Sequence, residues 1–214
     1  MRVKYPRTAH LPWSPGATAD DIYQGKLSLF EGKYVVVTEK MDGENITLYR
    51  DYMHARSVDS RFHPSRTWVK ALQAQIGYQI PEHWRVCGEN LYARHSIVYE
   101  GLNSYFLAFS VWNEANKCLS WQDTLTFCQR LGLDTPKVLY QGLWCEKTIR
   151  NLSIDTENQE GYVVRVAESF HYDDFVHCVA KWVRKGHVTG DKHWMHSEVV
   201  PNGLATKCET KQGG

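Results

Sequence analysis

The chain has 214 residues, of which 43% are hydrophobic, and this suffices to bury one substantial core, so we expect a single domain over residues 1–214. Lysine and arginine number 25 against 24 acidic residues, which excludes nucleic-acid binding through bulk positive charge, so any basic surface must be local. No apolar run reaches membrane-spanning length, and residues 1–6 contain no apolar signal core. We therefore expect a protein that does not enter a membrane.

The six cysteines are scattered, without a C-x-x-C pair or the spacing of a zinc site. Because the reducing cytosol keeps thiols unpaired, we expect free thiols and a cytoplasmic protein.

Residues 1–33 are rich in proline and glycine and are predicted to form an extended N-terminal segment, in which Thr18 could cap a short helix. Next, β-branched and alternating runs predict strands at about 34–39 and 45–50. A third short strand begins at Met53, and apolar residues at helical spacing predict a helix over 67–76.

The middle of the chain continues this mixture. Strands are predicted at 84–89 and 105–112, and the second is apolar on both faces, which indicates a central strand. Ser120 is a typical N-cap for a helix that ends at Gly132. A short strand over 136–140 and a helix over 145–152 follow.

The last predicted strands are 162–166 and 175–183, and a polar tail follows from about residue 186 to 214. The pattern lacks the regular βαβ alternation of a parallel sheet, so it predicts an α+β domain with antiparallel sheets. The candidate polar residues fall at strand ends, where a cleft between two sheets would collect them.

Lys40 stands where a β-branched run stops, and Asp42 and Gly43 follow at once. Glycine permits a turn or the close approach of another group. A lysine is a nucleophile only when neutral, so a catalytic lysine requires burial or nearby cations that lower its pKa. Taken alone, Lys40 would be read as a solvated lysine in a hairpin turn.

Five further sequence elements follow this turn in order. The complete set is Lys40-Met41-Asp42-Gly43, Arg56, Gly88-Glu89, Phe109 within an aromatic strand, Glu160-Gly161 and Lys181. This set, over roughly residues 34–185, resembles the covalent nucleotidyltransferases, which comprise polynucleotide ligases and mRNA capping enzymes. Asn45 stands where DNA ligases and capping enzymes carry arginine, and this resembles the RNA ligases of the phage nick-sealing type. Asp42, where that group often has histidine, and Arg165, where many relatives have lysine, depart from the pattern.

The resemblance implies a nucleotidyltransferase fold with antiparallel sheets flanking a nucleotide cleft. It implies that Lys40 attacks ATP to form a lysyl-AMP, which is used to join the 5′-phosphate and 3′-hydroxyl ends of RNA, most simply at a nick in a duplex. Lys181 would neutralise phosphate charge and help to lower the pKa of Lys40. Mg²⁺ or Mn²⁺ would be held by Glu160 and Glu89.

The resemblance also assigns the remaining nucleotide contacts. Arg56 and Asn45 would hold ribose or phosphate oxygens, Phe109 would stack on the adenine, and the adenine amino group would meet the backbone near Glu39. Each residue has a plainer reading: Phe109 as a core aromatic, Arg56 or Glu89 as a surface ion-pair residue, and Glu160 as a turn acid.

After the last predicted strand, a basic cluster could contact RNA phosphates or form a solvated face; its members are Arg184, Lys185 and Lys192, with His193 and Lys181 nearby. Full polynucleotide ligases usually carry a second domain, so a partner protein could supply one. The alternatives are a DNA ligase or capping guanylyltransferase, and a non-catalytic RNA-binding protein on a ligase scaffold.

Overall fold

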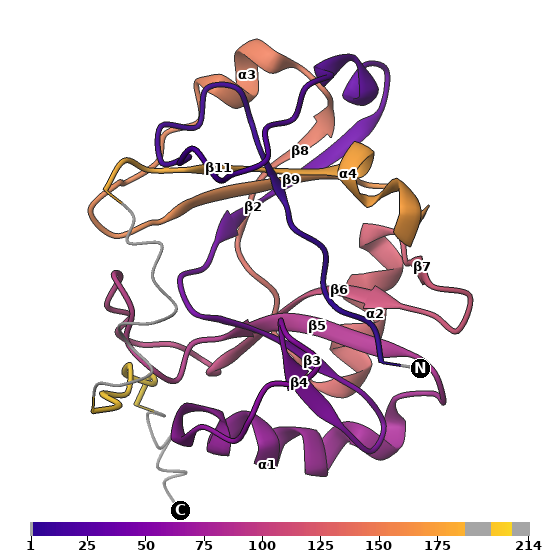
Figure 1. Cartoon of the computed structure of the whole chain (residues 1–214), viewed down its shortest axis with the longest axis vertical. Coiled ribbons are helices and arrows are strands. Elements are labelled where there is room, and N and C mark those ends of the chain that lie inside the picture. Colours follow the sequence, from indigo (N-terminus) through magenta and orange to yellow (C-terminus); the bar gives the residue numbers. More distant parts are fainter. Residues whose placement is uncertain (1, 187–197, 207–214) are drawn as a thin grey trace, which may run out of the picture.

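The computed structural model describes residues 2–186 and 198–206. Its strands form two sheets that lie one above the other, with the N-terminal segment crossing between them (Figure 1). The five-stranded sheet has the order β1-β11-β9-β2-β8, and the six-stranded sheet has the order β10-β7-β6-β5-β3-β4. All strand pairs are antiparallel except β1 with β11, which confirms the predicted α+β architecture.

The five-stranded sheet contains the lysine-bearing strand at an inner position. Its strands are β1 (Ala9–His10), β2 (Tyr34–Lys40), β8 (Val138–Leu143), β9 (Gly161–Val166) and β11 (Val179–Val183). The short helices η1 (Leu27–Phe30), α3 (Glu146–Arg150), η4 (Tyr172–Asp174) and α4 (Phe175–Cys178) connect them. Lys40 is the last residue of β2 rather than a turn residue.

The six-stranded sheet is covered on its outer face by two helices. Its strands are β3 (Glu44–Leu48), β4 (Met53–Ala55), β5 (Arg85–Asn90), β6 (Phe106–Trp112), β7 (Lys117–Cys118) and β10 (Phe170–His171). The helices are α1 (Thr67–Ile76), flanked by η2 (Pro64–Arg66) and η3 (Gly77–Gln79), and α2 (Trp121–Leu131). The predicted Ser120 cap is confirmed, since its hydroxyl accepts from Asp123 N–H at 3.1 Å.

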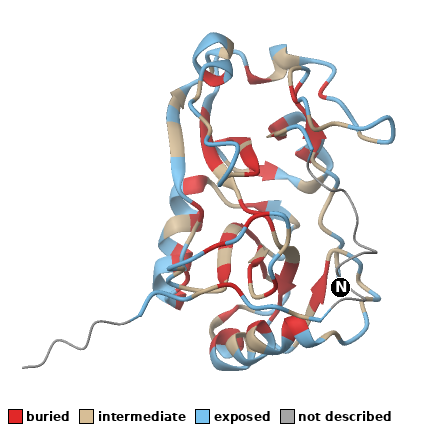
Figure 2. Ribbon diagram, turned by 90° about the vertical axis from the view of Figure 1, so that its left-hand side faces the viewer, coloured by how far each residue is buried: buried red, intermediate tan, exposed pale blue. Residues whose placement is uncertain are grey.

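Two apolar clusters follow from this layering. One lies between the sheets and joins Val37 and Val164 to Trp112, and the other lies between the six-stranded sheet and its helices and joins Val86 to Val69 and Phe127. Buried residues are accordingly concentrated in the strands of both sheets (Figure 2).

Two local predictions were wrong. No helix begins at Thr18, whose N–H and hydroxyl both donate to the Asp21 carboxylate at 2.9 Å. The residues after Asp21 instead pair with β1 through the backbone, where His10 N–H donates to Ile22 and Gln24 N–H donates to His10. The predicted strand 175–183 begins as helix α4, in which Phe175 and Cys178, three residues apart, are both buried. Among the described residues no helix is long and apolar enough to cross a membrane.

Candidate active site

A cavity of about 210 Å³ opens between the two sheets. Its wall includes most of the residues predicted from the sequence: Glu39, Lys40, Asn45, Arg56, Glu89, Phe109 and Lys181. Residues from both sheets therefore meet in one place, as the strand-end pattern predicts.

The Lys40 amine lies at the end of β2 and faces this cavity. Lys40 pairs in register with Gly161 on β9, and its Nζ contacts a carboxylate oxygen of Glu160, the residue before that strand. Glu160 is 0% exposed, whereas the Lys40 side chain retains 22% exposure. Glycine is required at 161, because a Cβ there would lie 2.0 Å from the carbonyl oxygen of Trp182. The close approach of β11 to β9 thus keeps Glu160 beside the lysine.

The electrostatics around Lys40 differ from the prediction. Burial alone would lower the pKa of Lys40, but the carboxylates of Glu160, Glu89 and Asp42 outweigh burial and raise it. The pKa of Lys40 is therefore raised rather than lowered as expected for a nucleophile, because the nearby acids dominate. Burial also raises the pKa of Glu89 to about 8, with Glu160 and Asp42 adding repulsion and Lys40 opposing it.

Lys181 lies on the same sheet, one strand further from Lys40. It pairs with Val163 across β9, and both residues line the cavity. Burial, followed by the positive charge of Lys40, lowers the pKa of Lys181, although Asp21 and Glu160 act in the opposite direction. Lys40 and Lys181 therefore place two positive charges on the wall of the cavity, on the strands either side of β9.

The six-stranded sheet supplies the facing wall. Glu89 on β5 pairs in register with Asn45 on β3, and a Glu89 oxygen accepts from the Gly43 N–H at 3.2 Å. Gly43 has no room for a side chain, since a Cβ would lie 2.4 Å from the carbonyl oxygen of Asn90. The Oδ1 atom of Asn45 is buried without a hydrogen-bond partner among the described residues. It is an acceptor suited to a donor on a ligand.

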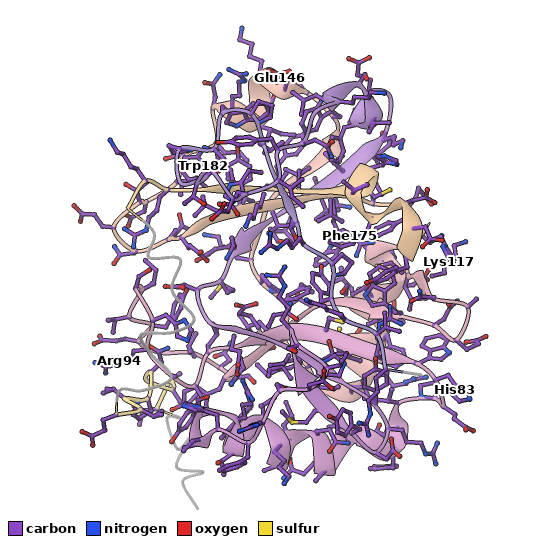
Figure 3. All side chains as sticks on the ribbon, viewed as in Figure 1. His83, Arg94, Lys117, Glu146, Phe175 and Trp182 are labelled. Atoms are coloured by element: carbon purple, nitrogen blue, oxygen red, sulfur yellow. The ribbon has the colours of Figure 1, made fainter. Side chains whose placement is uncertain are left out.

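Phe109 projects into the cavity from an irregularity in β6. The register with β5 shifts between Cys87 and Gly88, which leaves Phe109 between two regular pairs, and such bulges redirect side chains. The ring of Phe109 contacts that of Tyr5, whose ring also meets Phe175. Phe175 lies between the sheets (Figure 3).

Sequence reasoning missed three residues of the cavity wall. Tyr5, Trp121 and Arg165 all line it, and a nitrogen of Trp121 (Nε1) and one of Arg165 (Nη1) are buried without a partner within the described residues. Arg165 stands where many relatives have lysine, but that difference predicts no role for it. No role is predicted for Tyr5, because its ring contacts are with Phe109 and Phe175, which lie far along the chain.

The predicted basic cluster is divided. The Arg184 guanidinium donates to the carbonyl oxygen of Thr156 at 3.1 Å and to the hydroxyl of Ser96 at 3.3 Å, so it links three segments. Lys185 is exposed, and Lys192 and His193 lie outside the described residues. Within the described ranges, no three His, Cys, Asp or Glu side chains form a group that could hold a metal ion.

The family model named RNA ligase matches residues 33–183. Among solved structures, an archaeal ATP-dependent RNA ligase matches with a TM-score of 0.56 at 13% identity, covering 84% of this chain and 48% of that one. A variant of the Naegleria gruberi RNA ligase with ATP and Mn matches with a TM-score of 0.51 at 14% identity, covering 72% of this chain and 50% of that one. This chain therefore spans about half the length of these structures, whose likeness shows the fold. A search of curated proteins found no match.

Proposed function

The chain belongs to the RNA ligase family, and we propose that it is an ATP-dependent RNA ligase that carries AMP on Lys40. One observation carries this proposal: the amine of Lys40, held by Glu160, faces a cavity that Arg56 and Lys181 also line. The Naegleria structure with ATP and Mn is a further support, because it has the same fold.

The reaction has three phosphoryl-transfer steps. In the first, Lys40 Nζ loses a proton and forms a bond to the α-phosphorus of ATP, while the bond to pyrophosphate breaks. In the second, a 5′-phosphate oxygen of RNA takes the AMP and releases the lysine. In the third, the 3′-hydroxyl oxygen loses its proton and bonds to the phosphorus of the RNA 5′-phosphate, while the bond from that phosphorus to AMP breaks and AMP leaves. Such steps depend on positioning and charge neutralisation, for which Lys181 and Arg56 are placed.

We propose that a divalent cation is held by Glu89, which lines the cavity, and by Glu160, whose charge acts on Glu89. Mg²⁺ and Mn²⁺ favour oxygen ligands, and Mg²⁺ usually takes only one or two carboxylates beside substrate phosphates and waters. When bound, the cation would neutralise the carboxylate charge that now keeps Lys40 an ammonium and would polarise phosphate oxygens.

The nucleoside contacts follow from the remaining wall. Phe109 offers a ring face to the adenine, and the backbone near Glu39 is at the cavity for the adenine amino group. The unpartnered Oδ1 of Asn45 favours a ribose hydroxyl over a phosphate oxygen, since only the hydroxyl can donate to it. Arg56 is then the residue for phosphate oxygens.

The RNA substrate is proposed to be a nicked duplex, with Arg184, Lys185 and Lys192 near its phosphates. A partner protein that carries an accessory domain also belongs to the proposal. The five described cysteines are free thiols, which suits the reducing cytoplasm.

Sealing assays test the function. The protein is incubated with Mg²⁺, ATP or GTP, and a nicked duplex of RNA or of DNA, and Lys40→Arg is compared with Lys70→Ala, an exposed lysine on α1. We expect ATP-dependent sealing of RNA, abolished in Lys40→Arg and retained in Lys70→Ala. Preferred sealing of DNA would indicate a DNA ligase, and labelling from GTP a capping enzyme. No nucleotide transfer with retained RNA binding would indicate a non-catalytic protein.

A further inference from the structure

Residues 198–206, which follow the part matched by the family model, pack against the loop of residues 91–102 (the 91–102 loop). Arg94 N–H donates to the carbonyl oxygen of Val200 at 2.9 Å, and the Arg94 side chain donates to that of Pro201, also at 2.9 Å. Figure 1 shows this segment in yellow, and Figure 3 labels Arg94 close to it.

Asn202 ties the 91–102 loop together from this segment. Its side-chain nitrogen donates to the carbonyl oxygens of Leu91 at 2.7 Å and Ala93 at 3.4 Å, and its side-chain oxygen accepts from Tyr99 N–H at 2.9 Å. Asn202 is 3% exposed, so these bonds are sheltered from water. Its amide therefore fixes residues near both ends of the loop relative to one another.

The 91–102 loop, in turn, holds Asp42 by hydrogen bonds. One carboxylate oxygen of Asp42 accepts from Ser96 N–H at 2.8 Å, the Ser96 hydroxyl at 2.6 Å and Ile97 N–H at 2.8 Å. The N–H of Asp42 donates to the Tyr99 hydroxyl at 2.8 Å. Asp42 is 4% exposed, and four hydrogen bonds therefore hold its backbone and side chain to this one loop.

Asp42 follows Lys40 by two residues, and Met41 between them packs with Leu91 and Ile97 in a small apolar cluster. Both side chains that follow the lysine are thus anchored in the 91–102 loop.

We propose that Asn202 is a positioning residue for the nucleophile: by fixing the 91–102 loop it fixes Asp42, and through Asp42 the Lys40 amine. This inference rests on the proposed function of Lys40. It extends the active site to residues 198–206, beyond the matched residues 33–183.

The test compares Asn202→Ala with Val200→Ala, a largely exposed side chain of the same segment, in the full chain. The readouts are the maximal rate of self-adenylylation and the ATP concentration for half-maximal rate, below the melting temperature of each variant and per folded molecule. Displacing a reacting group by about 1 Å can cost 100-fold in rate, so we expect Asn202→Ala to slow the maximal rate about 10- to 100-fold. The ATP concentration for half-maximal rate should change less than about twofold in Asn202→Ala, because no nucleotide contact is removed. Val200→Ala should match the unaltered protein in both readouts.

A double variant separates positioning from general damage. If Asn202 acts through Asp42, Asn202→Ala with Asp42→Ala should be no slower than Asp42→Ala alone, whereas independent effects would multiply. Multiplying effects, or an unchanged maximal rate in Asn202→Ala, would overturn the inference.

Hydrogen exchange distinguishes this failure from failure of the proposed function. In Asn202→Ala, the amides of Asp42, Ser96 and Ile97 should exchange faster while those of β9 do not. Unchanged exchange would refute the positioning role whether or not the protein forms an AMP adduct. Faster exchange in a protein that forms no adduct would still show that Asn202 fixes the 91–102 loop and Asp42, and it would refute only the proposed chemistry of Lys40.

Discussion

The ring of Tyr5 lies edge-on against the ring of Phe109, with 5.3 Å between their centroids and 70° between their planes. Tyr5 meets Phe175 at the same distance, so a residue near the start of the chain joins aromatic rings of β6 and α4 at the cavity wall. We expect Tyr5 to fix the orientation of Phe109. Tyr5→Ala should weaken ATP binding several-fold by calorimetry, and Tyr5→Phe, which keeps the ring, should not. Tighter binding by Tyr5→Ala would instead make Tyr5 an obstruction.

Phe109 itself should carry the base. Loss of one base–aromatic stack costs about 1–3 kcal/mol, so Phe109→Ala should raise the Kd for ATP accordingly. The control is Leu107→Ala, a half-buried side chain on the same strand. If Phe109→Ala binds ATP normally while its melting temperature falls steeply, Phe109 is a core residue and the base stacks elsewhere.

Asn45 should distinguish ribose from deoxyribose. Its buried acceptor would gain one hydrogen bond from a ribose hydroxyl, worth about 1 kcal/mol, or several-fold in affinity. Competition between ATP and its 2′-deoxy and 3′-deoxy analogues measures this preference. We expect the unaltered protein to favour ATP over at least one analogue and Asn45→Ala to favour neither form. A preference that survives in Asn45→Ala would assign the ribose to another residue.

The basic cluster is best tested at Lys185 and Lys192, because Arg184 already donates to Thr156 and Ser96. Replacing both lysines with alanine should leave self-adenylylation intact and reduce sealing of pre-adenylylated RNA. The slope of the logarithm of the RNA-binding constant against the logarithm of the salt concentration should become less steep by roughly 0.7–0.9 per lost phosphate contact. Unchanged sealing would indicate a solvated face, and loss of self-adenylylation alone would place these lysines near the pyrophosphate of ATP.

The sequence predicts the strands around the site well, because their apolar periodicity and the residues at their ends are local features. It does not predict Tyr5 or Asn202, whose roles come from contacts with residues far along the chain. The short strands β1, β7 and β10 are not predicted for a different reason: each has two residues, too few to show an apolar period. A lowered pKa was expected for Lys40, whereas its pKa is raised, because the order of residues along the chain does not show that the charges of Glu89 and Glu160 outweigh burial.

The central claim is that Lys40 forms a covalent bond to AMP, and mapping the adduct tests it most directly. The protein is incubated with ATP and Mg²⁺ and digested, and the peptides are sequenced by mass spectrometry under conditions that preserve an acid-labile phosphoramidate. One AMP on the peptide of β2, assigned to Lys40 and absent from Lys40→Arg, is the predicted result. An AMP on another residue, or one that persists in Lys40→Arg, would contradict it.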